Sequence, residues 1–150
     1  MSDLLELVVL HRSGCGSPAK TERYTFDFVV SGQSLFAATG AASFDLSGCL
    51  SVPQREPELA LRINDRLARL LTSAVPIGGN ERVALFVCPE CGDLACGAIT
   101  AIVSRSDGIV RWSDFAYENG DDSETKLSKV GPFAFDWISY VTEIERACAG

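Results

Sequence analysis

The chain has 150 residues, the length of one ordinary domain, and its hydrophobic fraction of 47% fits a folded globule rather than a disordered segment. Twenty acidic residues against 13 basic ones give a net charge of −7, a field that repels nucleic-acid phosphates. No apolar run approaches the roughly 20 residues that span a membrane, and "MSDLLELVVLHR" lacks the features of a secretory signal. We therefore expect a cytoplasmic protein that binds neither nucleic acid nor membrane.

The first third of the chain has the pattern of strands joined by a loop. "LLELVVL" (4–10) is a short apolar run, and "YTFDFVV" (24–30) alternates apolar and polar residues as a half-buried strand does. Residues 11–23 carry Gly, Pro and charged side chains, which predicts a loop. "SLFAAT" (34–39) is a candidate hairpin partner for 24–30 across Gly32.

A helix is expected next. Glu56 and Pro57 suit its first turn, and Pro76 lies in the "VPIGGN" segment that ends the pattern. Five apolar residues recur at helical spacing between them: Leu59, Ile63, Leu67, Leu70 and Leu71. The stripe predicts a helix that packs on a core and needs no ligand.

The second half begins with three predicted strands and ends with a second helix. Residues 82–88, 97–105 and 109–118 have strand patterns, and "SDG" (106–108) reads as a hairpin turn. The final helix is expected to open at "GPF", with apolar residues at helical spacing: Phe133, Trp137, Tyr140, Val141, Ile144 and Cys148. This order predicts one α+β domain over 1–150, with a mainly antiparallel sheet and two amphipathic helices.

"CPECGDLACG" (88–97) places three of the six cysteines within nine positions. The proline after Cys88 pre-sets a turn, and the glycine after Cys91 allows the left-handed backbone that directs amides toward thiolates. Such a turn at the end of a strand is typical of a zinc knuckle, and Cys96 on the returning strand supplies a third ligand. We expect a structural zinc-knuckle hairpin here.

Structural zinc takes four tetrahedral ligands, and the sequence leaves the fourth open. Cys49 is our first choice. The loop with His11 and Cys15 is favoured beside it, since both segments contain glycine and can bend inward. Asp93 and Cys148 are the remaining candidates.

Two catalytic alternatives use the same cysteines. With only three protein ligands, water would occupy the fourth position and the zinc could hydrolyse a substrate. Cys88 and Cys91 could instead form the reactive dithiol of a thiol oxidoreductase. Against this, the motif joins two strands and lacks the helix N-terminus that lowers the pKa of a thioredoxin-type thiol.

"WSDFAYE" (112–118) combines aromatic and acidic residues. Strict alternation would place Trp112 and Asp114 on one face and Tyr117 on the other. The simple interpretation is a core strand whose acids reach solvent. The functional interpretation is a recognition surface in which Trp112, Asp114, Tyr117 and Glu118 bind a basic protein.

The segments "VCPECGDLACGAITA" (87–101), "VRWSDFAYEN" (110–119) and "VGPFAFDW" (130–137) together resemble a family of small bacterial proteins of unassigned function, some loosely labelled oxidoreductase. The resemblance covers about residues 83–137, and the pattern CPxCGDLxCG is its most distinctive part. It implies no established substrate and no catalytic residue. No flavin or nicotinamide fingerprint accompanies it.

These patterns favour a small acidic protein that binds a basic partner without catalysis, with zinc as a structural cofactor. Size and acidity, and nothing else, also suggest the toxin-neutralising immunity proteins. The alternative is an enzyme, either the thiol oxidoreductase or the open-site zinc hydrolase.

Overall fold

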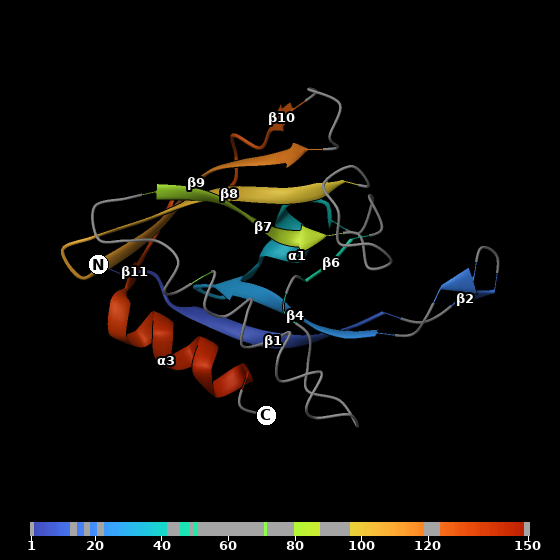
Figure 1. Ribbon diagram of the computed structural model, residues 1–150, viewed down its shortest axis with the longest axis horizontal. Helices are drawn as coiled ribbons and strands as arrows, with labels where there is room; N and C mark the ends of the chain where they lie inside the picture. Colours follow the sequence, from blue (N-terminus) through green and yellow to red (C-terminus); the bar gives the residue numbers. More distant parts are fainter. Residues whose placement is uncertain are drawn as a thin grey trace.

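The computed structural model describes residues 2–12, 15–16, 19–20, 23–41, 46–48, 50, 71, 80–87, 97–118 and 124–148. In these residues the chain forms two main antiparallel sheets, a small two-stranded sheet and two helices (Figure 1). The predicted α+β class with a mainly antiparallel sheet is confirmed. No helix in the described ranges is long and apolar enough to cross a membrane.

The first sheet has the order β1-β4-β5. Its strands are β1 (Leu5–Arg12), β4 (Arg23–Val30) and β5 (Gln33–Ser34). The alternation in β4 has the expected effect, because Phe26, Phe28 and Val30 are all buried on one face. Beyond the end of this sheet, β2 (Cys15–Gly16) pairs with β3 (Ala19–Lys20).

The second sheet has the order β10-β9-β8-β7-β6, with β11 also paired to β9. Its strands are β6 (Ser47–Gly48), β7 (Asn80–Val87), β8 (Ala98–Ser106), β9 (Ile109–Glu118), β10 (Glu124–Lys126) and β11 (Phe133–Asp136). The β8–β9 turn is confirmed at Asp107 and Gly108, which have φ angles of 51° and 74°. Positive φ at both central residues matches the right-handed twist of a hairpin.

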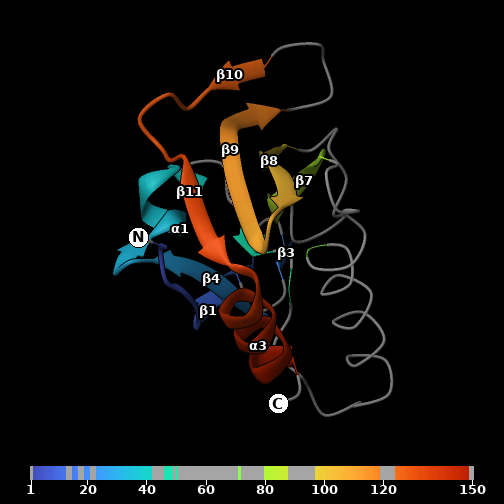
Figure 2. The ribbon, with the colours of Figure 1, turned by 90° about the vertical axis from the view of Figure 1, so that its left-hand side faces the viewer.

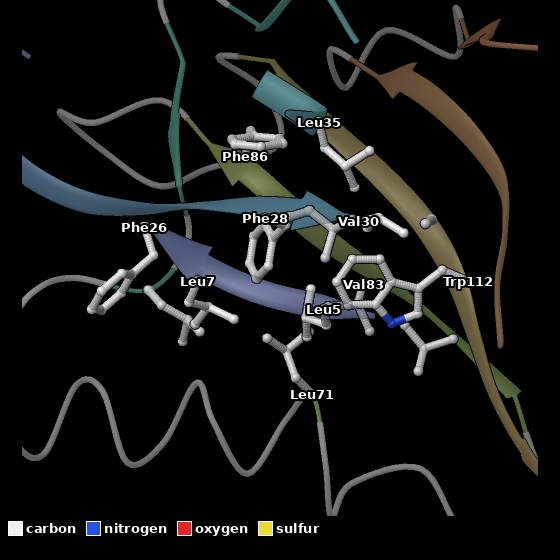
Figure 3. Close-up of a cluster of buried hydrophobic side chains, with 14 of the residues drawn as sticks. Leu5, Leu7, Phe26, Phe28, Val30, Leu35, Leu71, Val83, Phe86 and Trp112 are labelled. Atoms are coloured by element: carbon white, nitrogen blue, oxygen red, sulfur yellow. The ribbon is translucent and has the colours of Figure 1, made fainter. Parts of the chain in front are cut away.

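The core lies between the two sheets and α3 (Trp137–Cys148). Figures 1 and 2 show α3 alongside β1. The ring of Phe28 meets Phe86 and Trp112 edge to face, with centroids 5.8 and 5.4 Å apart (Figure 3). These aromatic contacts connect β4 of one sheet with β7 and β9 of the other.

Two predictions for the N-terminal part need correction. Residues 11–23 are not simply a loop, since β1 continues to Arg12 and the β2–β3 pair lies within them. The segment 34–39 is not a strand: β5 ends at Ser34 and α1 (Leu35–Ala38) follows. The Ser34 hydroxyl accepts a hydrogen bond from the Ala37 amide at 3.2 Å, as a helix N-cap does.

The final helix begins later than expected. Residues 133–136 form β11, which pairs with residues 109–112 of β9, and α3 starts at Trp137. The Asp136 carboxylate accepts a hydrogen bond from the Ser139 amide at 3.0 Å and so caps the helix. The helix predicted after Glu56 lies outside the described residues except for Leu71, which is helical and buried.

Candidate functional site

Three strand termini meet at one end of the second sheet. Ala98, the first residue of β8, pairs with Val87, the last residue of β7, and with Glu118, the last residue of β9. The chain between Val87 and Gly97 contains Cys88, Cys91, Cys96 and Asp93, all outside the described residues. The structure therefore fixes both stems of the cysteine hairpin and places β9 beside them. This set of strand termini is called the hairpin base below.

Gly97 and Tyr117 are in contact at the hairpin base. Gly97 is buried with a φ of +103°, and a Cβ built on it would lie 2.7 Å from the Tyr117 hydroxyl oxygen. Both the backbone conformation and the space require glycine at this position. Tyr117 is half-buried: its side chain packs against the hydrophobic core, and its ring lies against the Gly97 backbone.

Glu118 is the described acid of the hairpin base. It is half-buried, and β10 places Glu124 directly opposite it in the antiparallel register. The register therefore brings the backbones of two acidic residues to the same place at the hairpin base.

Asp114 lies at a bulge in β9 and not at a regular strand position. The β8–β9 register shifts between Thr100 and Ile102, and Asp114 has a φ of 52°. An extra residue in one strand moves all later side chains to the opposite face. For this reason Phe115 is buried on the side of Trp112, and the strict alternation expected for 109–118 is wrong after Ser113.

Two cations hold the Asp114 carboxylate. Lys126 donates to Oδ2 at 2.8 Å, and the Arg82 guanidinium pairs with the same oxygen. Arg82 also donates to the Asp114 carbonyl at 3.0 Å and to the Thr100 hydroxyl at 2.9 Å. The Lys126 hydrogen bond, with the charges of both cations, lowers the pKa of Asp114. This carboxylate therefore connects β9 with β7 and β10, and its charge is already compensated.

Trp112 is a core residue with 0% of its surface exposed. Its ring meets Phe135 at a centroid distance of 5.0 Å, and its Nε1 donates to the Tyr140 hydroxyl at 3.3 Å. A ring packed between two sheets cannot anchor a partner at the surface. Of the four residues expected to bind a partner, the structure brings only Tyr117 and Glu118 to the hairpin base.

Cys49 lies outside the described residues, but both its neighbours are placed. Gly48 pairs with Phe86, two residues before Cys88, and the Leu50 carbonyl accepts a hydrogen bond from the Phe26 amide at 3.0 Å. Because β6 and β7 are antiparallel, β6 runs toward Cys49 in the direction opposite to that in which β7 runs toward Cys88. The pair nearest to Cys88 is Ser47 with Val87.

The backbones of the other three ligand candidates lie in described elements. His11 pairs with Tyr24 near the end of β1, Cys15 is in β2, and Cys148 ends α3. Figure 1 places β2 beyond the far end of β1 and β4. Among the described side chains there is no group of three or more histidine, cysteine, aspartate or glutamate residues that could hold a metal ion.

Sequence reasoning missed Gly97, Arg82 and Lys126. The first had a usable signal, because a glycine directly after Cys96 can adopt positive φ where a strand begins. The pairing of Arg82 and Lys126 with Asp114 depends on strand register and on the bulge, which no local pattern reveals.

Comparison of the chain with protein-family models, curated proteins and solved structures finds no match. The family resemblance of residues 83–137 therefore stays a prediction, and the proposals below depend on the structure and the sequence alone.

Proposed function

We propose that this protein is a non-catalytic binding module that recognises a basic protein at the hairpin base. Tyr117 and Glu118 form the described part of the surface, and the cysteine hairpin borders it. The supporting observation is the double pairing of Ala98 with Val87 and Glu118. Residues far apart in the sequence converge there.

A basic partner is supported by charge. Glu118 and Glu124 occupy opposed register positions, and the chain as a whole carries −7. The net charge accelerates encounter with a cationic partner, while the local acids fix where it binds. Tyr117 adds a rigid aromatic surface of the kind enriched at interaction hot spots. Asp114 and Trp112 have no part in this proposal, because the former is paired and the latter buried.

In this proposal zinc closes the hairpin through Cys88, Cys91, Cys96 and Cys49. Thiolates are good zinc ligands, and four of them complete the tetrahedral shell of a structural site. The support for Cys49 is that it follows Ser47 by two residues, and Ser47 pairs with Val87, the residue before Cys88. For Cys96 it is that β8, which begins two residues later, pairs with β7. The bound ion would stabilise the turn, since the binding energy of a structural metal contributes to folding.

The binding proposal is tested by selecting, from a random display library, peptides that bind the full chain. We expect Lys- and Arg-rich sequences, whose binding is lost in Tyr117→Ala and in Glu118→Gln. The matched control is Glu145→Gln, which removes the same charge from an exposed position on α3. Peptides whose binding is unaffected by both hairpin-base variants would contradict the proposal, and thiol-dependent turnover would favour the oxidoreductase.

A further inference from the structure

β1 is an edge strand with apolar side chains exposed to solvent on both faces. It ends the order β1-β4-β5, and its consecutive residues Val8 and Val9 are 46% and 55% exposed. Successive strand residues point to opposite faces, so both sides of the strand are apolar at this point. Edge strands with these properties pair readily with another strand, and soluble proteins usually protect them.

The hydrogen bonds of β1 identify which residues face outward. The Ser31 amide donates to the Leu4 carbonyl at 2.8 Å, which makes Leu4 part of the ladder to the strand beside it. The Leu7 amide instead donates to the Glu143 carboxylate of α3 at 2.7 Å, away from β4. Because this direction alternates along an antiparallel strand, the backbone groups of Val9 also face away from β4.

We propose that two copies of this chain associate by antiparallel pairing of their β1 strands about a two-fold axis at Val9. In an antiparallel pair, a residue whose backbone groups face the partner strand pairs only with a residue that also faces it. The two-fold axis of a symmetric pair therefore passes beside one residue of each copy and not between two residues. The axis at Val9 sets Val9 opposite its own counterpart, Val8 opposite Leu10, and Glu6 opposite Arg12.

Charge selects this register over its neighbours. An axis at Val8 would set Glu6 against Leu10 and Arg12 against Leu4, and an axis at Leu10 would set Val8 against Arg12. Only the axis at Val9 pairs opposite charges. It does so twice by symmetry.

The monomer supplies a second reason for an acid opposite Arg12. Within the β1–β4 ladder, the register sets Arg12 directly opposite Arg23, a second basic residue. Glu6 of the second copy would bring a negative charge to this position. Pairing also requires Glu143 to release the Leu7 amide, so α3 competes with the second copy for the same edge.

Sedimentation equilibrium of the reduced full chain, from about 1 μM to about 1 mM, tests the proposal. We expect a reversible dimer. Val9→Lys places two like charges at the axis and should raise the dissociation constant about tenfold or more. The control Ile138→Lys adds the same charge to the most exposed large hydrophobic residue of the described chain, 73% exposed and on α3, and should leave the constant unchanged.

A charge exchange tests the register itself. Glu6→Arg and Arg12→Glu should each weaken the dimer, and the double variant should restore it. Glu143→Ala should strengthen it, because the Leu7 amide is then open to the second copy. A chain that stays monomeric over the whole range, or a dimer insensitive to Val9→Lys, overturns the proposal. A dimer that the charge exchange fails to restore overturns the register.

Discussion

The Tyr117 ring lies against Gly97, where the chain returns from the cysteine segment into β8. A Cβ on Gly97 would come within 2.7 Å of the Tyr117 hydroxyl and 3.2 Å of a ring carbon. Tyr117 is also paired with Ile99 in the β8–β9 ladder. The aromatic side chain proposed to contact a partner therefore also supports the stem of the cysteine hairpin.

Gly97→Ala should destabilise the protein by about 1–3 kcal/mol, because it adds a clash to an unfavourable positive φ. Urea unfolding monitored by fluorescence measures this loss. Gly32→Ala is the matched control, since Gly32 has a φ of +85° and nothing within 4 Å of the added Cβ. Adding Tyr117→Phe to Gly97→Ala should restore part of the loss, because the nearest atom is the hydroxyl oxygen. Equal losses in the Gly32 and Gly97 variants would refute the contact.

Asp114→Asn should destabilise the protein at neutral pH by removing the charge that Lys126 and Arg82 share. The folded-state pKa of Asp114 is lowered from 3.8, so its stabilising effect is complete well above pH 3.8 and disappears as the pH falls through the folded-state pKa. The unfolding free energies of the wild type and of Asp114→Asn should therefore become equal at acidic pH. Since the ion pairs of Asp114 are partly exposed, added salt should also reduce the difference in stability between the wild type and Asp114→Asn.

The control for Asp114→Asn is Asp107→Asn, the same substitution at another aspartate of positive φ, 51°, in the exposed β8–β9 turn. It should change the unfolding free energy at neutral pH less than Asp114→Asn does, because Asp107 lies in an exposed turn. The measurement is the unfolding free energy of the wild type and of both variants from about pH 3 to pH 7. A constant difference between wild type and Asp114→Asn over this range would contradict the ion-pair account.

Glu143→Ala should loosen the contact between α3 and β1. The carboxylate accepts the Leu7 amide at 2.7 Å and two hydrogen bonds from Arg146 at 2.6 and 2.8 Å. Those from Arg146 are the main cause of the lowered pKa of Glu143. Hydrogen bonds to a charged group suggest a loss of about 1.5–3 kcal/mol.

Amide hydrogen exchange separates this contact from a general loss of stability. At a protein concentration where the chain is monomeric, the Leu7 amide of Glu143→Ala should exchange faster, while the Phe26 amide, bonded to the Leu50 carbonyl, should keep its protection. Glu145→Ala, on the exposed side of α3, is the control. Unchanged exchange at Leu7 would show that Glu143 does not protect this edge. A lower pH should reproduce the effect, because protonation removes the acceptor charge.

The parts of the fold that the sequence predicts well are those set by local patterns. The alternation of Phe26, Phe28 and Val30 and the Asp107–Gly108 turn both follow from residue type and spacing. The helix predicted from residue 133 is wrong for residues 133–136, because "FAFD" is apolar enough for either structure and only pairing with β9 decides between them. Tertiary contacts overrode the local pattern here.

The candidate site depended even more on long-range structure. The acids and aromatics of β9 were visible in the sequence, but their roles were not. An aspartate at positive φ shifts the alternation at Asp114, so Trp112 and Phe115 enter the core while Tyr117 reaches the hairpin base. A bulge of this kind has no dependable local signature, since aspartate is common both in turns and at strand ends.

Native mass spectrometry of the freshly purified chain tests the central claim, that zinc closes the hairpin beside Tyr117. We expect one zinc ion per chain, lost in Cys88→Ser and Cys49→Ser and retained in Cys15→Ser and Cys148→Ser. A metal-free chain that folds normally would contradict the claim, and zinc retained in Cys88→Ser would place the ion elsewhere.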